Sequence, residues 1–143
     1  MYEILLIAHL ILIAMGTGMA FSHLIFLRAS SGEAGERGVA LAHARRVLGD
    51  FTTMVVVFIW ITGLMLLWSR YGDPDRTVSA WFYGKIAFVG LFTGAHFMQR
   101  LKAARFPGND YSDLVKRLEL WTSLAWLSAL LAICLAVVSF TKP

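Results

Sequence analysis

The sequence has little cysteine and little charge, and each shortage excludes a class of protein. Its one cysteine, Cys134, lies in an apolar stretch, which excludes an internal disulfide and any metal site built from several thiolates of one chain. Charged residues make up only 15% of the chain, whereas hydrophobic residues make up 58%. Because a soluble globular domain carries a larger charged fraction, this composition predicts an integral membrane protein.

Long apolar stretches occupy most of the chain, and each is long enough to cross a hydrocarbon core, which takes about 20 helical residues. They lie at residues 4–27, 51–68, 81–98 and 118–140. They lack the alternation of barrel strands, and lipid cannot satisfy open backbone groups, so α-helices are expected. We predict an all-α four-helix bundle in one membrane domain, 1–143. Its helices are expected at about 3–28, 38–70, 79–104 and 111–140.

Basic residues are distributed unevenly between the ends of these helices. The connections after the first and third apolar stretches carry Arg28, Arg37, Arg45, Arg46, Arg100, Lys102, Arg105, Lys116 and Arg117. The opposite side carries only Arg70, Arg76 and Lys142. The positive-inside rule then predicts an N-out/C-out multi-pass protein of a bacterial inner membrane. The net charge of +4 is explained by this asymmetry, so no nucleic-acid partner is expected. No removable signal peptide is expected either.

Four ionisable side chains lie inside the apolar stretches, where they are costly and by default mark a functional site. His9 and His23 are fourteen residues apart, which places them about 40° from each other around one helix. Lys85 and His96 are eleven apart, about three helical turns. Since these two helices run in the same direction, we predict an outer pair, His9 with Lys85, and an inner pair, His23 with His96.

The histidines indicate a haem site. Neutral imidazole binds haem iron, and a four-helix bundle can hold a haem between histidines on facing helices. We therefore take His9, His23 and His96 as candidate haem iron ligands and haem b as the expected cofactor. The sixth ligand remains open between a histidine and a methionine, with candidates Met19, Met54 and Met98.

Two further residues are candidates for catalysis. The Lys85 ammonium can hold a porphyrin propionate or a quinone carbonyl, although a shallow lysine can also extend to the headgroups. Glu119, at the start of the last apolar stretch, is either a proton carrier or the partner of Arg45 or Arg46 in an interfacial ion pair. The sequence leaves both alternatives open.

Small residues predict where helices come close. Gly90 and Gly94 form a GxxxG pair, and Gly16 with Ala20 forms a similar pair in the first apolar stretch. Both patterns favour close backbone contact between membrane helices.

Two strings of the sequence resemble the HemJ family of four-helix membrane protoporphyrinogen oxidases. They are YEILLIAH, which ends at His9, and WFYGKIAFVGLFTGAH, which contains Lys85 and ends at His96. GTGMAF and GDFTTM resemble related four-helix proteins grouped near HemJ and the copper-resistance CopD domain. The aromatic-Leu-Pro-Arg and Asn-Glu-x-Pro motifs of HemJ are missing. The resemblance implies a haem b protein that handles porphyrin or quinone electrons.

Three functions follow, in order of preference. The first is a haem b-binding oxidoreductase that passes electrons from a porphyrinogen or quinol to a membrane acceptor. The second is a non-catalytic accessory or assembly subunit, either as a homo-oligomer or within a larger respiratory or photosynthetic complex. The third is metal or proton transport, which ranks lowest because the apolar stretches lack repeated acidic residues, although copper uptake by His and Met fits the ligand types.

Overall fold

The computed structural model is all-helical throughout the residues that it describes, which are 2–30, 35–71, 80–105 and 111–141. Its helices are α1 (Tyr2–Ser30), α2 (Glu36–Tyr71), α3 (Ala80–Arg105) and α4 (Tyr111–Thr141). The all-α prediction is confirmed, and each helix begins and ends within one turn of its predicted boundary.

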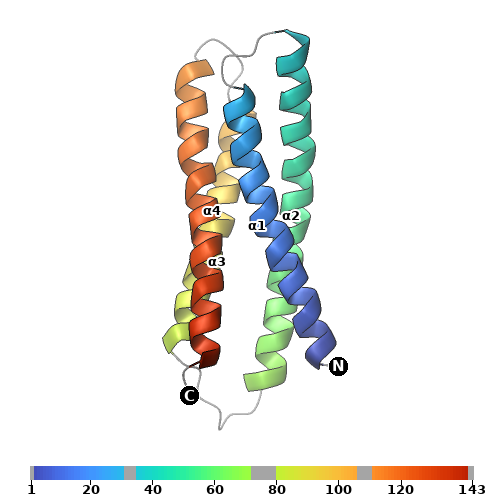
Figure 1. Ribbon diagram of the computed structural model, residues 1–143, viewed down its shortest axis with the longest axis vertical. Helices are drawn as coiled ribbons and strands as arrows, with labels where there is room; N and C mark the ends of the chain where they lie inside the picture. The colour runs from blue at the N-terminus through green and yellow to red at the C-terminus, as the bar shows by residue number, and fades with distance from the viewer. Residues whose placement is uncertain (1, 31–34, 72–79, 106–110, 142–143) are drawn as a thin grey trace.

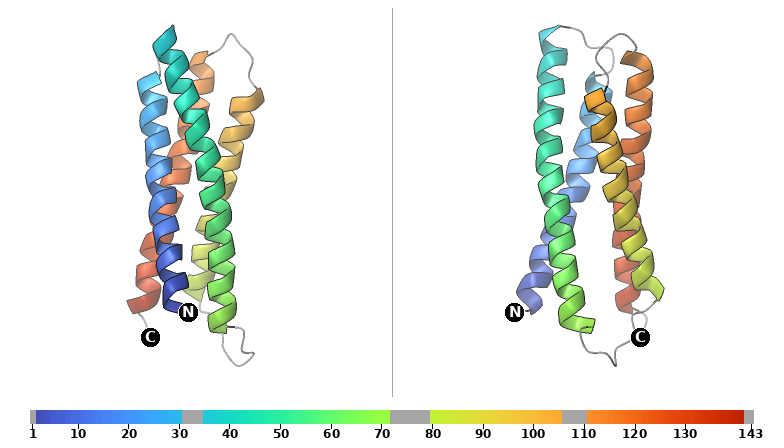
Figure 2. Two further views of the ribbon diagram at one scale, coloured as in Figure 1. Left: turned by 90° about the vertical axis from the view of Figure 1, so that its right-hand side faces the viewer. Right: turned by 180° about the vertical axis from the view of Figure 1, so that it is seen from behind.

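Successive helices run in opposite directions, so the two chain ends lie at the same end of the molecule (Figure 1). The packing is uneven: α1 packs mainly on α2, α3 packs mainly on α4, and α1 joins the two halves by packing on α4. By contrast, the backbones of α2 and α3 come close at few points, and the two helices cross at an angle (Figure 2). Side-chain hydrogen bonds join them instead, from His96 to Thr53, from Trp60 to Thr93 and from Arg100 to Asp50.

Three helices are long and apolar enough to cross a membrane: α1, α2 over Glu36–Ser69, and α4 over Leu118–Ala136. These helices indicate a membrane protein in contact with a lipid bilayer. Within its described residues α3 does not meet the same criterion, because Lys85, His96 and Gln99 interrupt its apolar sequence. Three of the expected spans are thus supported by length and composition, while the third in chain order stays a prediction.

Large apolar side chains cover the outside of the helices. Ile4 is 73% exposed, Met54 62% and Trp68 80%, and many Leu, Ile and Phe side chains resemble them. A soluble monomer rarely exposes so continuous an apolar surface, whereas a bilayer covers it. The distribution agrees with the membrane assignment.

Small residues let the helices approach one another at the centre. The buried cluster combines Val56 and Phe92 with four alanines, Ala20, Ala95, Ala125 and Ala129. A Cβ on Gly16 would lie 3.2 Å from Ile59 Cδ1, so Gly16 is a point of close contact between α1 and α2, as its pairing with Ala20 predicts.

The same prediction is wrong for Gly90 and Gly94. Both are exposed, and a Cβ on either would meet nothing within 4 Å. The reason is the rotation of α3, which buries Phe92, Ala95 and His96 and turns the glycine face outward.

Candidate functional site

The predicted inner pair is brought together beside one turn of α2. A Cβ on Gly49 would lie 3.7 Å from His23 Cε1, and Thr53, one turn further along, has its Oγ1 2.9 Å from His96 Nε2. His23 is 5% exposed and His96 2%, and the two rings are close enough to interact electrostatically. Two imidazoles from α1 and α3 therefore meet in the interior against α2.

The tautomer of His96 depends on which way the Thr53 hydroxyl turns. Thr53 Oγ1 lies 2.9 Å from the Gly49 carbonyl, which can only accept. When the hydroxyl donates there, it accepts from His96 Nε2–H, because it has no second proton to give. A neutral His96 ring then keeps its lone pair on Nδ1.

His23 is the unusual member of the pair. Both of its ring nitrogens are buried, and neither has a hydrogen-bond partner among the residues that the structure describes. A buried polar group without a partner costs about 1–3 kcal/mol. An iron atom bound at one imidazole nitrogen would remove part of that cost, since a ring nitrogen is a common metal ligand.

In the predicted outer pair, His9 contacts α2 and Lys85 lies within electrostatic reach of it. His9 Nδ1 lies 2.7 Å from Thr62 Oγ1, which is also 2.7 Å from the Phe58 carbonyl; when the hydroxyl donates to that carbonyl, His9 Nδ1–H is the donor and Nε2 keeps the lone pair. A Cβ on Gly63 would lie 3.2 Å from His9 Cε1, so the absence of a side chain at Gly63 lets the His9 ring pack against α2. Lys85 interacts electrostatically with His9, and its Nζ lies 5.6 Å from the Phe82 ring centroid.

The two pairs are separate sites. His96 contacts α2 at Thr53 and His9 contacts it at Thr62, nine residues further along. At ~1.5 Å rise per residue these contacts are about 14 Å apart along α2. His9 and His96 therefore cannot ligate the same iron atom.

Glu119 has a different partner from either one expected. Arg28 Nε donates to Glu119 Oε1 at 2.8 Å, so the predicted pairing with Arg45 or Arg46 is wrong. The reason is packing, because the end of α1, which carries Arg28, lies against the start of α4. The Arg28 and Glu119 side chains remain 66% and 37% exposed.

The methionine alternatives differ from the histidines in exposure. Met54 is 62% exposed and Met98 38%, so both side chains face outward, while Met19 is half-buried. This favours histidine over Met54 or Met98 as the second ligand of an internal iron site.

Sequence reasoning missed the contribution of α2. Thr53 and Thr62 orient the two histidines, and Gly49 and Gly63 make room for the rings of His23 and His9. The available signal was that Thr53 follows Gly49 by one turn and that Thr62 directly precedes Gly63.

The inner pair offers two imidazoles, which is the number of axial ligands that a haem iron takes. Among the described residues there is no group of three or more His, Cys, Asp or Glu side chains able to hold a bare metal ion. Haem iron needs only two axial ligands, because the porphyrin supplies the other four. Arg100 lies beside the pair, with Nη1 3.0 Å from the position of a Gly49 Cβ, and its Nη2 donates to Asp50 Oδ1.

Comparison with known proteins adds no family to this description. No family model matches the chain, and no curated protein or solved structure matches it.

Proposed function

We propose that the chain is a haem b-binding oxidoreductase of a bacterial inner membrane, with His23 and His96 as the axial iron ligands. One observation carries the proposal: His23 is buried beside His96 with both ring nitrogens unpaired. The HemJ-like strings that end at His9 and His96 support the same cofactor. Bound there, the haem would supply one-electron transfer between a porphyrinogen or quinol and a membrane acceptor.

The surrounding residues of this chain orient and insulate the pair. Thr53 holds the His96 ring through Nε2–H and leaves Nδ1 to coordinate; ligation through Nε2 would require this hydrogen bond to break. Burial of both rings excludes water from the site.

The outer pair suits a substrate. His9 Nε2 keeps a lone pair that accepts a proton, and Lys85 contributes a positive charge near it. Together they suit a porphyrinogen carboxylate, a quinone carbonyl or a second porphyrin, with Lys85 as the group that binds and polarises it. Glu119, paired with Arg28 at the opposite end of α1, stays a candidate for proton transfer at that end.

The basic residues orient the molecule within this proposal. Arg28, Arg45 and Arg100 lie at the end of the bundle nearest the inner pair, and the positive-inside rule assigns that end to the cytoplasm. Both chain termini are then outside, and the outer pair faces the periplasmic side.

Variants of the inner pair test the proposal. In detergent-purified protein, His23→Ala and His96→Ala should each abolish the Soret band, whereas His43→Ala should retain it because His43 is exposed. His23→Met supplies a different iron ligand, so it should retain haem with a changed reduction potential. A wild-type Soret band in the His23→Ala and His96→Ala variants would refute the ligand assignment.

The accessory-subunit function has one observation in its favour. Gly90 and Gly94 leave an open, exposed face on α3 against which another helix can pack. Copurification of a large membrane partner with a colourless chain would favour this function over the oxidoreductase.

A further inference from the structure

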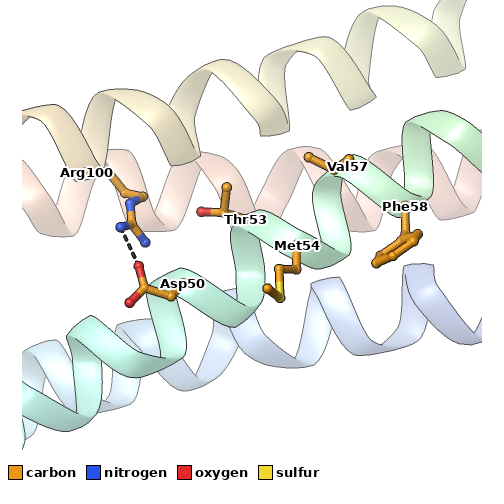
Figure 3. A pocket seen from close by; sticks show the side chains of 6 residues that line it. All are labelled: Asp50, Thr53, Met54, Val57, Phe58 and Arg100. Carbon is orange, nitrogen blue, oxygen red and sulfur yellow. Dashed lines mark hydrogen bonds and ion pairs between the residues drawn. The ribbon is translucent and has the colours of Figure 1, made fainter.

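An open groove of ≈ 430 Å³ lies between α2 and α3, where these helices diverge (Figure 3). It is lined by Asp50, Thr53, Met54, Val57, Phe58 and Arg100. Figure 3 shows the charged residues at one end and Val57 and Phe58 toward the other. The groove is thus amphiphilic along its length, with a polar end near the inner pair and an apolar end along the bilayer-facing surface of α2.

We propose that this groove binds the head group of a prenylated quinone or quinol, with the prenyl tail along α2. The assignment of a redox role to that ligand rests on the proposed haem function, whereas the binding itself does not. The apolar end suits the tail because Met54, Val57 and Phe58 are 62%, 47% and 52% exposed and therefore contact the same hydrocarbon that dissolves it.

The polar end suits a head group without net charge. Arg100 Nη2 donates to Asp50 Oδ1 at 2.5 Å, so a cationic donor and an anionic acceptor stand side by side. A quinone carbonyl accepts from Arg100, and a quinol hydroxyl donates to Asp50, so both redox forms find a partner. An anionic phospholipid head would gain the Arg100 contact but would meet the Asp50 carboxylate, which favours the neutral quinone.

Thr53 connects the groove to the inner pair. It lines the groove and also accepts the hydrogen bond from His96 Nε2–H. A head group at the polar end is therefore separated from His96 by a single side chain. A quinone head group this close to His96 is close enough to exchange electrons with a haem bound by the inner pair.

Photolabelling tests the site directly. The purified chain, in phosphatidylcholine nanodiscs, is labelled with a short-chain azidoquinone, and the labelled residues are mapped by mass spectrometry. The label should fall on the 50–58 segment of α2 and around Arg100, and unlabelled short-chain quinone should displace it. Added phosphatidylglycerol should not. Labelling spread along other helices, or displacement by phosphatidylglycerol as effective as by quinone, would overturn the proposal.

Matched variants separate groove binding from haem binding. Val57→Trp fills the groove, and Arg100→Gln removes the charged donor, so each should weaken quinone binding about tenfold or more. Leu127→Trp, at a 50% exposed position of α4 outside the groove, should leave the affinity unchanged. Unchanged affinity in Val57→Trp would refute the site. The Soret band, measured on the same samples, should persist in Val57→Trp. If the chain is colourless but the groove is still labelled specifically, the haem function is contradicted and the quinone-binding site is supported.

Discussion

Two threonines of α2 influence which ring nitrogen carries the proton in the histidines of α1 and α3. Each lies within hydrogen-bond distance of a backbone carbonyl of its own helix, and when it donates there it acts as an acceptor toward the histidine. Thr62 leaves His9 with a free Nε2, whereas Thr53 leaves His96 with a free Nδ1. In this arrangement the two histidines adopt opposite tautomers.

The Thr53 hydrogen bond gives the first prediction. Thr53→Val keeps the shape of the side chain but removes the acceptor, which leaves the His96 N–H buried without a partner. We expect a loss of about 1–3 kcal/mol in stability, measured as a lower unfolding midpoint in detergent. Thr53→Ser should restore most of it. Thr17→Val is the control, because the Thr17 hydroxyl bonds only its own helix, at Ile13 O. Equal losses in Thr53→Val and Thr17→Val would contradict the role of Thr53.

Residue spacing predicted which ionisable groups of α1 and α3 lie at the same depth. The structure places His23 and His96 against one turn of α2, and Lys85 within electrostatic reach of His9. Spacing did not predict Thr53 or Thr62, because their contacts depend on how α2 is rotated toward its neighbours. Helical periodicity fixes the relative angles within one helix, but the rotation of one helix against another is set by packing across the whole bundle.

At the scale of the helices, their ends were predictable and the face that α3 buries was not. The helices extend beyond their apolar stretches into charged residues, as α2 does from residue 51 back to Glu36, so their ends follow helix-forming and turn-forming residues rather than hydropathy. The GxxxG pattern at Gly90 and Gly94 marks a face able to pack closely, yet it does not say whether the partner lies in the same chain. Here that face is exposed.

Glycine substitutions test the assigned faces. Gly16→Ala forces a Cβ to 3.2 Å from Ile59 in a buried contact, so it should destabilise the protein by about 1–3 kcal/mol. Gly94→Ala meets open space and should be neutral, or stabilising by up to about 1 kcal/mol, because alanine is the better helix former. Unfolding midpoints in detergent measure both. A larger loss for Gly94→Ala than for Gly16→Ala would contradict the rotation of α3, or would show that another chain packs on this face.

At the scale of the whole molecule, the arrangement of basic residues predicts the orientation in the membrane. The two termini lie at the end opposite the Arg-rich one, so both should be outside the cytoplasm (Figure 1). Alkaline phosphatase fused to the C-terminus should be active, and green fluorescent protein fused there should be dark. The reverse pattern would place the inner pair on the periplasmic side and would contradict the orientation.

Haem binding by His23 and His96 is tested most directly by one absorption spectrum. The detergent-purified chain is measured oxidised and then reduced with dithionite, and haem is quantified as the pyridine haemochrome. We expect a Soret band with reducible α and β bands and about one haem b per chain, as two axial histidines provide. A protein that stays colourless after expression with added haem precursor would contradict the haem function and favour the accessory subunit.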